Sequence, residues 1–333
     1  TEFYLSLKLR PHKVTDFGSV QGLRDRLLIS LQEYRKIQQS GIILDFRKDL
    51  FDPTNTYARI GGGSLGGKAR GLGFINTLIT NYDISHKFDD VEISVPSAIV
   101  LGTAVFDAFI GENKLADDLE ITRKFVDAPH FPNDIIDKLR QFLEITTCPL
   151  AVRSSSLLED SQFLPFAGVY ETYMIPNSNP DLEIRLVELL QSIKSVFAST
   201  FHKKAKDYVK ATNYGLEEEK MAVIVQRLVG TKKEQRFYPD FAGVAKSYNF
   251  YPVPPQKSMD GIALVALGLG KTVVEGGNTI RFCPRYPKHL MQFFSTKETL
   301  KNAQQDFYAL DLNGKLDHHP NSIEDPLVKS YAL

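Results

Sequence analysis

The segment Ala151-Val-Arg-Ser-Ser-Ser-Leu-Leu-Glu-Asp-Ser-Gln-Phe-Leu-Pro-Phe-Ala-Gly-Val-Tyr-Glu-Thr-Tyr173 predicts a strand, a polar loop and a second strand. The apolar pair Ala151-Val152 leads into Arg153, and three serines follow at 154–156. In the second strand, the two-residue period divides the side chains between two faces: Gly168, Tyr170 and Thr172 on one, and Val169, Glu171 and Tyr173 on the other.

Arg153 has the clearest chemistry in this segment. Its guanidinium is permanently charged, and together with the neighbouring hydroxyls and the side-chain-free Gly168 it suits the recognition of a polyphosphate. An ordinary surface hairpin, in which Arg153 pairs with Glu159 or Asp160, accounts for the same pattern. Taken alone, the segment leaves both interpretations open.

The composition is typical of a globular protein with more than one subdomain. The 333 residues are 43% hydrophobic and 24% charged, and 40 basic residues balance 40 acidic ones. This length predicts two or three subdomains. The zero net charge argues against a broad nucleic-acid or membrane surface, although it allows a local basic pocket.

The cysteines and the chain ends indicate the compartment and the extent of the sequence. Cys148 and Cys283 are far apart and form no CxxC pair, so we expect a reducing compartment, the cytoplasm, with no disulfide framework and no zinc knuckle. The sequence has no run of about 18 apolar residues that would predict a transmembrane helix, and no signal peptide. Both chain ends fall inside expected elements, which predicts a fragment of a longer protein.

Residues 1–58 are expected to form a helical extension or the end of an upstream domain. Ser19 is predicted to cap a helix that runs to about Gln39, because Gly41 follows at a position typical of a helix end. Residues 45–57 are polar and irregular, which predicts a linker.

The stretch Gly61-Gly-Gly-Ser-Leu-Gly-Gly-Lys-Ala-Arg-Gly71 predicts a glycine-rich loop followed by a helix. It satisfies GxGxxG, but residues 56–60 are a poor first strand for a dinucleotide site. It also satisfies GxxxxGK, but Ala69 stands where a P-loop needs a hydroxyl for Mg²⁺. Two further interpretations are a phosphate-binding backbone with Lys68 at a helix N-terminus, and a structural turn with an exposed lysine.

The remaining pattern indicates mixed α and β structure. A strand pair broken at Pro96 is expected over 91–101, and further strands over 221–229, 241–248 and from 262. Thr103, Asn133 and Asp181 are predicted to cap helices.

Gln226 interrupts the apolar strand that begins at Met221, and a buried amide must be paired. Either an adenine edge or a neighbouring backbone would serve. Two strand-rich lobes that divide near residue 220 would form a cleft, which Lys68, Arg153 and Gln226 would enter.

Five motifs occur in an order that resembles the N-terminal nucleotide-binding domain of phosphoenolpyruvate synthase and pyruvate phosphate dikinase, which rifampin phosphotransferases share. The resemblance spans roughly residues 60–285. The motifs are Gly66-Gly-Lys-Ala-Arg-Gly-Leu72, Ala151-Val-Arg-Ser-Ser-Ser-Leu-Leu-Glu-Asp160, Phe166-Ala-Gly-Val-Tyr-Glu-Thr-Tyr173, Met221-Ala-Val-Ile-Val-Gln226 and Gly268-Leu-Gly-Lys-Thr-Val-Val-Glu-Gly-Gly277.

The resemblance implies an α+β, ATP-grasp-like fold with ATP between a first lobe at 59–220 and a truncated second lobe at 221–333. It also implies Mg²⁺, because two cations neutralise only part of the triphosphate charge. The residues it places at the site share contact with the nucleotide or its loop: Lys68 and Arg153 on the phosphates, where they would also be catalytic, Gly168 and Thr172 near the phosphates and ribose, Gln226 on the adenine side, and Glu159 orienting Arg153 or the loop.

The sequence also departs from the family pattern. The family's metal carboxylates lie in a Glu-Phe…Leu-Gln-x-Arg run that is missing here, and Ile323-Glu-Asp-Pro does not match it, so those ligands are expected beyond Leu333. The phosphoryl-carrying histidine in a Thr-x-His-Ala-Ala-like motif and the pyruvate-binding barrel are also missing from this sequence.

We therefore expect the ATP-binding domain of a phosphotransferase that passes phosphoryl from ATP to a histidine on another domain, and then to pyruvate or another small acceptor. The fragment alone is expected to be inactive, with no nucleic-acid or membrane partner. One alternative is a nucleotide-sensing regulatory module, which the separate N-terminal region suggests. A P-loop NTPase is a further alternative.

Overall fold

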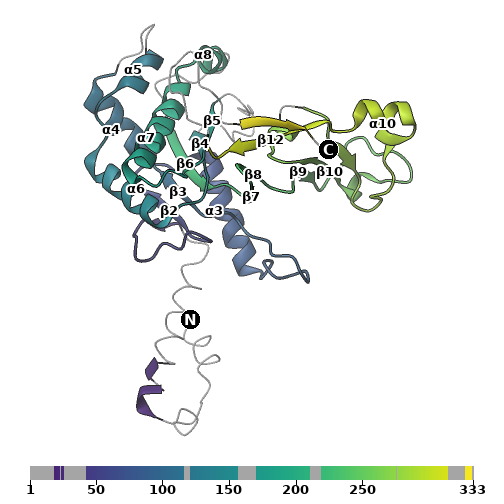
Figure 1. Cartoon of the computed structure of the whole chain (residues 1–333), viewed down its shortest axis with the longest axis horizontal. Helices are drawn as coiled ribbons and strands as arrows, with labels where there is room; N and C mark the ends of the chain where they lie inside the picture. Colours follow the sequence, from purple (N-terminus) through teal and green to yellow (C-terminus); the bar gives the residue numbers. More distant parts are fainter. Residues whose placement is uncertain are drawn as a thin grey trace.

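A mixed sheet of six strands forms the centre of the first part of the molecule (Figure 1). The computed structural model describes residues 19–22, 24–25, 43–115, 121–156, 170–210, 219–274, 276–313 and 327–331. In spatial order the strands are β1 (Leu44–Asp45), β2 (Tyr57–Ile60), β3 (Ala98–Leu101), β6 (Met221–Arg227), β4 (Leu150–Ser156) and β5 (Thr172–Ile175). The pairs β1–β2 and β2–β3 are parallel, and the other neighbours are antiparallel.

The central strands are apolar on both faces because both faces of the sheet are covered. Every residue of β3 is buried, and so is β6 from Met221 to Gln226. Strands covered on both faces are expected to be continuously apolar rather than alternating. This burial places β3, β6 and β4 at the centre of the core.

Helices cover the two faces of this sheet unequally. On one face α4 (Thr103–Asn113), α5 (Ile121–Asp127), α6 (Asn133–Ile145) and α7 (Leu182–Ser199) share one apolar core with β3, β4 and β6, and α8 (Lys203–Lys210) follows α7. On the other face α3 (Gly66–Asn81) packs its Ala69 against Tyr57 and Ile224. α3 leaves part of its face of the sheet uncovered for the second part of the molecule.

The second part consists of two small antiparallel sheets that extend away from α4–α7 (Figure 1). One has the order β13 (Leu327–Tyr331), β12 (Asp306–Asp311), β8 (Arg236–Tyr238) and β7 (Thr231–Lys233). The other has the order β11 (Ile280–Phe282), β10 (Ile262–Leu267) and β9 (Phe241–Lys246). The connections contain α9 (Lys271–Val274), α10 (Thr296–Asn302) and the 3₁₀ turns η3 (Ser258–Asp260) and η4 (Met291–Phe293).

An apolar cluster joins the two parts. Ala151 and Leu228 from the first part pack with Leu269 and Leu310 from the second, and all four are buried. The Ser178 hydroxyl donates to a backbone carbonyl of the second part at 2.8 Å. The cluster lies on the α3 side of the sheet, because Ala151 is in register with Gln226 two residues before Leu228.

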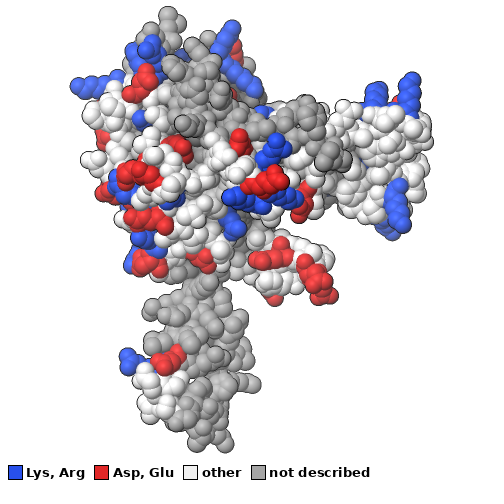
Figure 2. All heavy atoms as spheres, in the orientation of Figure 1, with Lys and Arg blue, Asp and Glu red and all other residues white. Residues whose placement is uncertain are grey.

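The surface and the helices agree with the composition. Figure 2 shows basic and acidic side chains interspersed over the visible face of the described residues. Among the described helices, none combines the length and the apolar character needed to span a bilayer.

Several sequence predictions are confirmed. The fold is mixed α and β, and Asp181 caps α7 by accepting the Glu183 N–H at 2.9 Å. The Ser19 hydroxyl accepts the Gly22 N–H at 3.1 Å, as expected of a helix cap, while most of the predicted helix to Gln39 lies outside the described residues. The division near residue 220 stays a prediction, but β6 pairs with β3 and β4 in the first sheet.

Other predictions were wrong. Tyr57–Ile60 is a strand, whereas residues 91–95 are not, and β3 begins only at Ala98. Neither Thr103 nor Asn133 caps its helix. The Thr103 hydroxyl instead accepts the Ser64 N–H at 2.9 Å, which ties α4 to the glycine-rich loop.

Candidate functional site

Arg153 lies in β4, a mostly buried interior strand of the six-stranded sheet, so the alternative of a hairpin at the surface does not hold for this strand. The pairing of Arg153 with Glu159 or Asp160 in that alternative lies outside the described residues. It is in register with Thr172 of β5 on one side and Ile224 of β6 on the other. Side chains in register point to the same face, and Ile224 packs against Ala69 of α3. Arg153 therefore lies on the α3 face of the sheet.

Gln226 is the partner of Arg153. The Arg153 Nη1 donates to the Gln226 Oε1 at 3.5 Å, and the Gln226 Nε2 donates to the Pro96 carbonyl at 3.2 Å. Both ends of this buried amide are thus paired, as the sequence required, through a backbone carbonyl and a guanidinium. The amide orients the half-buried guanidinium along the sheet.

Lys68 reaches the same strand from α3. It is the third residue of the helix, and its Nζ donates to the Ser154 Oγ at 3.2 Å. Ser154 follows Arg153 directly. One predicted cation therefore belongs to β4, and the other contacts the next residue of the same strand. The expectation of a lysine at a helix N-terminus is confirmed, although the helix begins at Gly66, inside the predicted loop.

The start of α3 is pressed against β4. Gly66 has φ +74°, and a Cβ built there would fall 1.7 Å from the Ser155 carbonyl oxygen. Only glycine allows this conformation and this approach. The Ser155 hydroxyl accepts the Ala69 N–H at 3.0 Å and donates to the Leu65 carbonyl at 2.8 Å.

The three serines at 154–156 are strand residues and are fully buried, whereas the sequence predicted a polar loop. The serine run predicted a loop because buried hydroxyls need hydrogen-bond partners. Here α3 supplies such partners to Ser154 and Ser155, whereas those of an exposed loop would be water. Ser155 is the residue at this contact that sequence reasoning did not single out. The sequence could at most have indicated burial of these serines, because they directly follow the apolar strand residues Ala151-Val152.

Burial and charge around Arg153 affect a second residue that the sequence did not single out. The Tyr57 hydroxyl donates to the Ala69 carbonyl at 3.0 Å. Burial raises the pKa of Tyr57 well above its ordinary value, and the Arg153 charge opposes that rise. Tyr57 is therefore a neutral hydrogen-bond donor that holds α3 on the sheet beside Arg153.

The other predicted residues are placed differently. Thr172 begins β5 and is exposed. Glu171 precedes it, and its Oε1 lies 4.0 Å from the Nδ1 of His202. Burial lowers the pKa of His202 below its ordinary value, and the charge of Glu171 partly opposes this. Gly168 and Glu159 lie outside the described residues. Thus Arg153, Gln226 and Thr172 are brought together on neighbouring strands, and Lys68 joins them through Ser154.

The described part of the chain contains no group of three His, Cys, Asp or Glu side chains arranged to hold a metal ion. The predicted location of the metal carboxylates beyond Leu333 stays a prediction.

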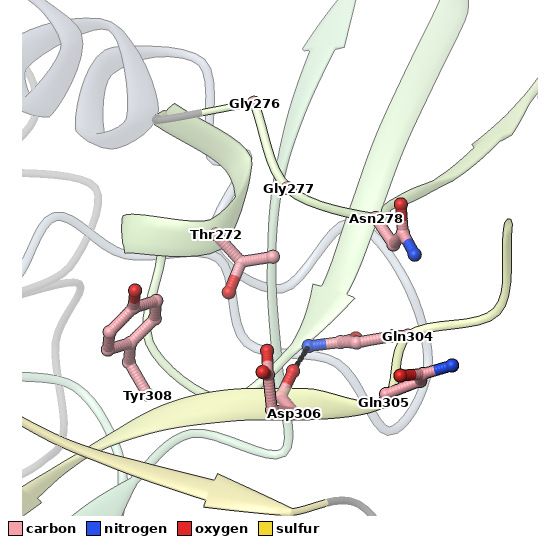
Figure 3. Close-up of a pocket in the computed structure, with 8 residues that line it drawn as sticks. All are labelled: Thr272, Gly276, Gly277, Asn278, Gln304, Gln305, Asp306 and Tyr308. Carbon is pink, nitrogen blue, oxygen red and sulfur yellow. Dashed lines mark hydrogen bonds between the residues drawn. The ribbon is translucent and has the colours of Figure 1, made fainter. Parts of the chain in front are cut away.

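A separate pocket of about 310 Å³ lies in the second part, between the segment that contains α9 and the start of β12 (Figure 3). Gln304 lies at its edge, donating to the Asp306 carbonyl at 2.9 Å and accepting the Leu267 N–H at 2.7 Å. These bonds connect β10 to β12, so the amide has a structural role. The pocket is lined by Thr272, Gly276, Gly277, Asn278, Gln304, Gln305, Asp306 and Tyr308, and thus by none of the predicted nucleotide residues.

Comparison with known families supplies a match over this region. The family model described as "Pyruvate phosphate dikinase, AMP/ATP-binding domain" matches residues 63–290, more than half of the chain. Lys68, Arg153, Thr172 and Gln226 all fall within the matched residues. The match begins inside the glycine-rich loop and continues past β11.

Curated relatives are much longer than this chain. A phosphoenolpyruvate synthase of Aeropyrum pernix is 26% identical over 240 residues, which is 64% of this chain and 25% of that protein. An uncharacterized phosphotransferase of Bacillus subtilis is 28% identical over 190 residues, 56% of this chain and 21% of that protein. A rifampicin phosphotransferase of Bacillus cereus is 23% identical over 207 residues, 55% of this chain and 22% of that protein. The matched region of this chain thus spans only about a fifth to a quarter of the length of these relatives.

Proposed function

Because this chain belongs to the pyruvate phosphate dikinase AMP/ATP-binding domain family, we propose that it binds ATP on the sheet face that carries Arg153. The observation that carries this proposal is the 3.5 Å contact between the Arg153 guanidinium and the neutral amide of Gln226. Among the described residues, no carboxylate lies within ion-pair distance of Arg153. A half-buried cation with a neutral partner favours an anion, and the guanidinium fork matches phosphate oxygens.

Lys68 is proposed to complete the phosphate site. It stands in the first turn of α3, where backbone N–H groups and the helix dipole favour an anion. Its bond to Ser154 holds the ammonium beside the strand that carries Arg153. Both cations would contact the phosphates and stabilise charge during phosphoryl transfer, and each charge-assisted hydrogen bond contributes about 1.5–3 kcal/mol.

The other residues have proposed roles around these two cations. Thr172, exposed opposite Arg153, would contact the phosphate and ribose region. Gln226 would lie toward the adenine, and Gly168 and Glu159 would belong to the loop that closes on the phosphates. In this proposal the architecture is ATP-grasp-like, with ATP between lobes at 59–220 and 221–333.

Mg²⁺ is proposed as a companion of ATP. Because the described residues contain no metal-binding cluster, we assign none of them to the ion. Mg²⁺ commonly binds through substrate phosphates and retained waters. It would neutralise the part of the triphosphate charge that Lys68 and Arg153 leave unpaired.

The parent protein is proposed to be a phosphotransferase. Relatives named phosphoenolpyruvate synthase and rifampicin phosphotransferase support this class. In this proposal the phosphoryl group passes from ATP to a histidine on another domain, and then to pyruvate or another small acceptor. The chain alone would bind the nucleotide without completing this transfer.

The direct test is calorimetric titration of the 333-residue chain with ATP, AMP and adenosine, each with and without Mg²⁺. We expect saturable ATP binding that weakens as phosphates are removed and as salt is raised, because screening weakens charge contacts. A lack of ATP binding, or equal affinity for ATP and adenosine, would contradict a phosphate site at Arg153 and Lys68.

A further inference from the structure

Ser155 stands between the two elements that carry the proposed phosphate ligands. Its hydroxyl is fully buried and lies between the Ala69 N–H, at 3.0 Å, and the Leu65 carbonyl, at 2.8 Å. In an ordinary helix these two groups would bond directly to each other, four residues apart. The Ser155 hydroxyl of β4 is therefore inserted into the first hydrogen bond of α3. Insertion of a side chain into this hydrogen-bond ladder is one of the causes of helix kinks.

The backbone contact next to this bond limits how the two elements can move. Gly66 comes so close to the Ser155 carbonyl that a Cβ would fall 1.7 Å from its oxygen. The first turn of α3 is thus attached to β4 at one residue, by a hydroxyl bridge on one side and by backbone contact on the other. Lys68 lies two residues after Gly66, and Arg153 two residues before Ser155.

We infer that Ser155 is a positioning residue for nucleotide binding: its hydroxyl bridge sets the separation of Lys68 and Arg153 so that both reach one phosphate chain. This inference rests on the proposed function. Ser154 has a complementary part, because its hydroxyl accepts the Lys68 ammonium at 3.2 Å and holds it against β4. In this inference Arg153, Ser154 and Ser155 act together: one residue supplies a cation, and the two hydroxyls position Lys68, the second cation.

A purely structural role for Ser155 would give a different result from a positioning role. If the hydroxyl only stabilised the fold, its loss would raise the Kd values for ATP and for adenosine by the same factor. Loss of a positioning hydroxyl would selectively weaken ligands that touch both cations. The chain offers a matched control in Ser156, which is equally buried, in the same strand, one residue along and therefore on the opposite face.

The experiment compares Ser155→Ala with Ser156→Ala in the 333-residue chain. Calorimetry measures ATP binding, and NMR titration measures the weaker binding of adenosine. We expect Ser155→Ala to raise the Kd for ATP about tenfold, the effect of one lost charge contact, and to change the Kd for adenosine less than about twofold. Ser156→Ala should leave the ratio of the two constants unchanged.

Hydrogen exchange of the ligand-free proteins gives a second readout that needs no nucleotide. In Ser155→Ala the amides of residues 67–69 should exchange about tenfold faster, while those in the second half of α3 and in α6 keep the wild-type rates. Uniformly faster exchange, or equal ratios of ATP to adenosine affinity in the two variants, would overturn the inference. Wild-type protein that binds no ATP would overturn the proposed function, and the nucleotide role of Ser155 with it, whatever the exchange pattern.

Discussion

Burying the Arg153 guanidinium costs solvation free energy in the free protein, and a bound anion could offset that cost. Its guanidinium is half-buried and donates to a neutral amide oxygen, and the described residues place no carboxylate beside it. Removing a cation from water is unfavourable unless it is well paired. Lys68 of α3 contacts Ser154, the next residue of the same strand, so a second positive charge reaches β4 beside Arg153. Arg153 therefore contributes more to a complex with an anion than to the stability of the free fold.

This difference gives the first prediction. Arg153→Ala should weaken ATP binding tenfold or more, since a charge-assisted contact contributes about 1.5–3 kcal/mol. The ligand-free protein should lose at most about 1–3 kcal/mol of unfolding free energy, because the buried Gln226 Oε1 loses its partner while the cost of burying the cation is removed. Calorimetry and urea denaturation measure the two quantities on the same sample.

Arg123→Ala is the matched control for Arg153→Ala. Arg123 is an exposed arginine of α5 that pairs with Asp127 at 3.3 Å, and exposed pairs of this kind contribute little to stability. Its removal should change neither ATP binding nor stability measurably. Equal losses of ATP affinity in the two variants would show that general charge, rather than the site, attracts the nucleotide.

At the scale of elements, α3 shows how local sequence and tertiary contact can conflict. It contains glycines at 66, 67, 71 and 73, which are poor helix formers. Gly66 is required by its positive φ and by its contact with Ser155. A Cβ at Gly71 would meet nothing within 4 Å, so that glycine is not required by packing.

The two glycines therefore predict opposite effects of one substitution. Gly71→Ala should stabilise the protein by about 0.5–1 kcal/mol, because alanine restricts the unfolded chain and favours the helix. Gly66→Ala should destabilise it by about 2 kcal/mol or more, since alanine adds strain at positive φ and pushes α3 from β4. Urea midpoints test both. The same sign for the two variants would contradict the close approach of α3 to β4.

The elements that could be predicted from sequence are those whose local pattern agrees with their packing. The apolar periodicity of α6 and α7 and the continuous apolar run of β6 were sufficient, and so was the Asp181 cap. β2 was missed because it is four residues long and carries Arg59 on an exposed position. Ser154 and Ser155 of β4 were missed because their partners lie in α3 and at the residue that precedes it, 86 or more residues away in the chain.

The residues of the candidate site could be singled out from the sequence to a similar extent and for the same reason. Arg153, Lys68 and Gln226 were identified because fixed charge, glycine and a polar residue in an apolar strand are visible in the sequence. Ser155 and Tyr57 were not, because their roles depend on a helix packing across the sheet. Residues that act through another element are only visible once the elements are assembled.

At the scale of the whole molecule, the two parts are joined chiefly by a small apolar cluster. Leu310 of β12 is fully buried against Ala151 and Leu228, and Leu269 is 2% exposed in the same cluster. The cluster lies on the same sheet face as Arg153, because Ala151 and Arg153 are two residues apart in β4. The second part therefore adjoins the proposed phosphate site without supplying its cations.

This arrangement predicts that the two parts can be loosened from each other without dismantling the first sheet. Leu310→Ala should cost about 2–5 kcal/mol of local stability through lost burial and a cavity. Amide exchange should accelerate in β10 and β12, while β4 and β6 keep protection near the wild-type level, because they retain their own core. Leu300→Ala, at a leucine of α10 that is 70% exposed, should change exchange nowhere. If Leu310→Ala instead accelerated exchange equally in all four strands, the two parts would unfold as a single cooperative unit, and an independently mobile second lobe would be excluded.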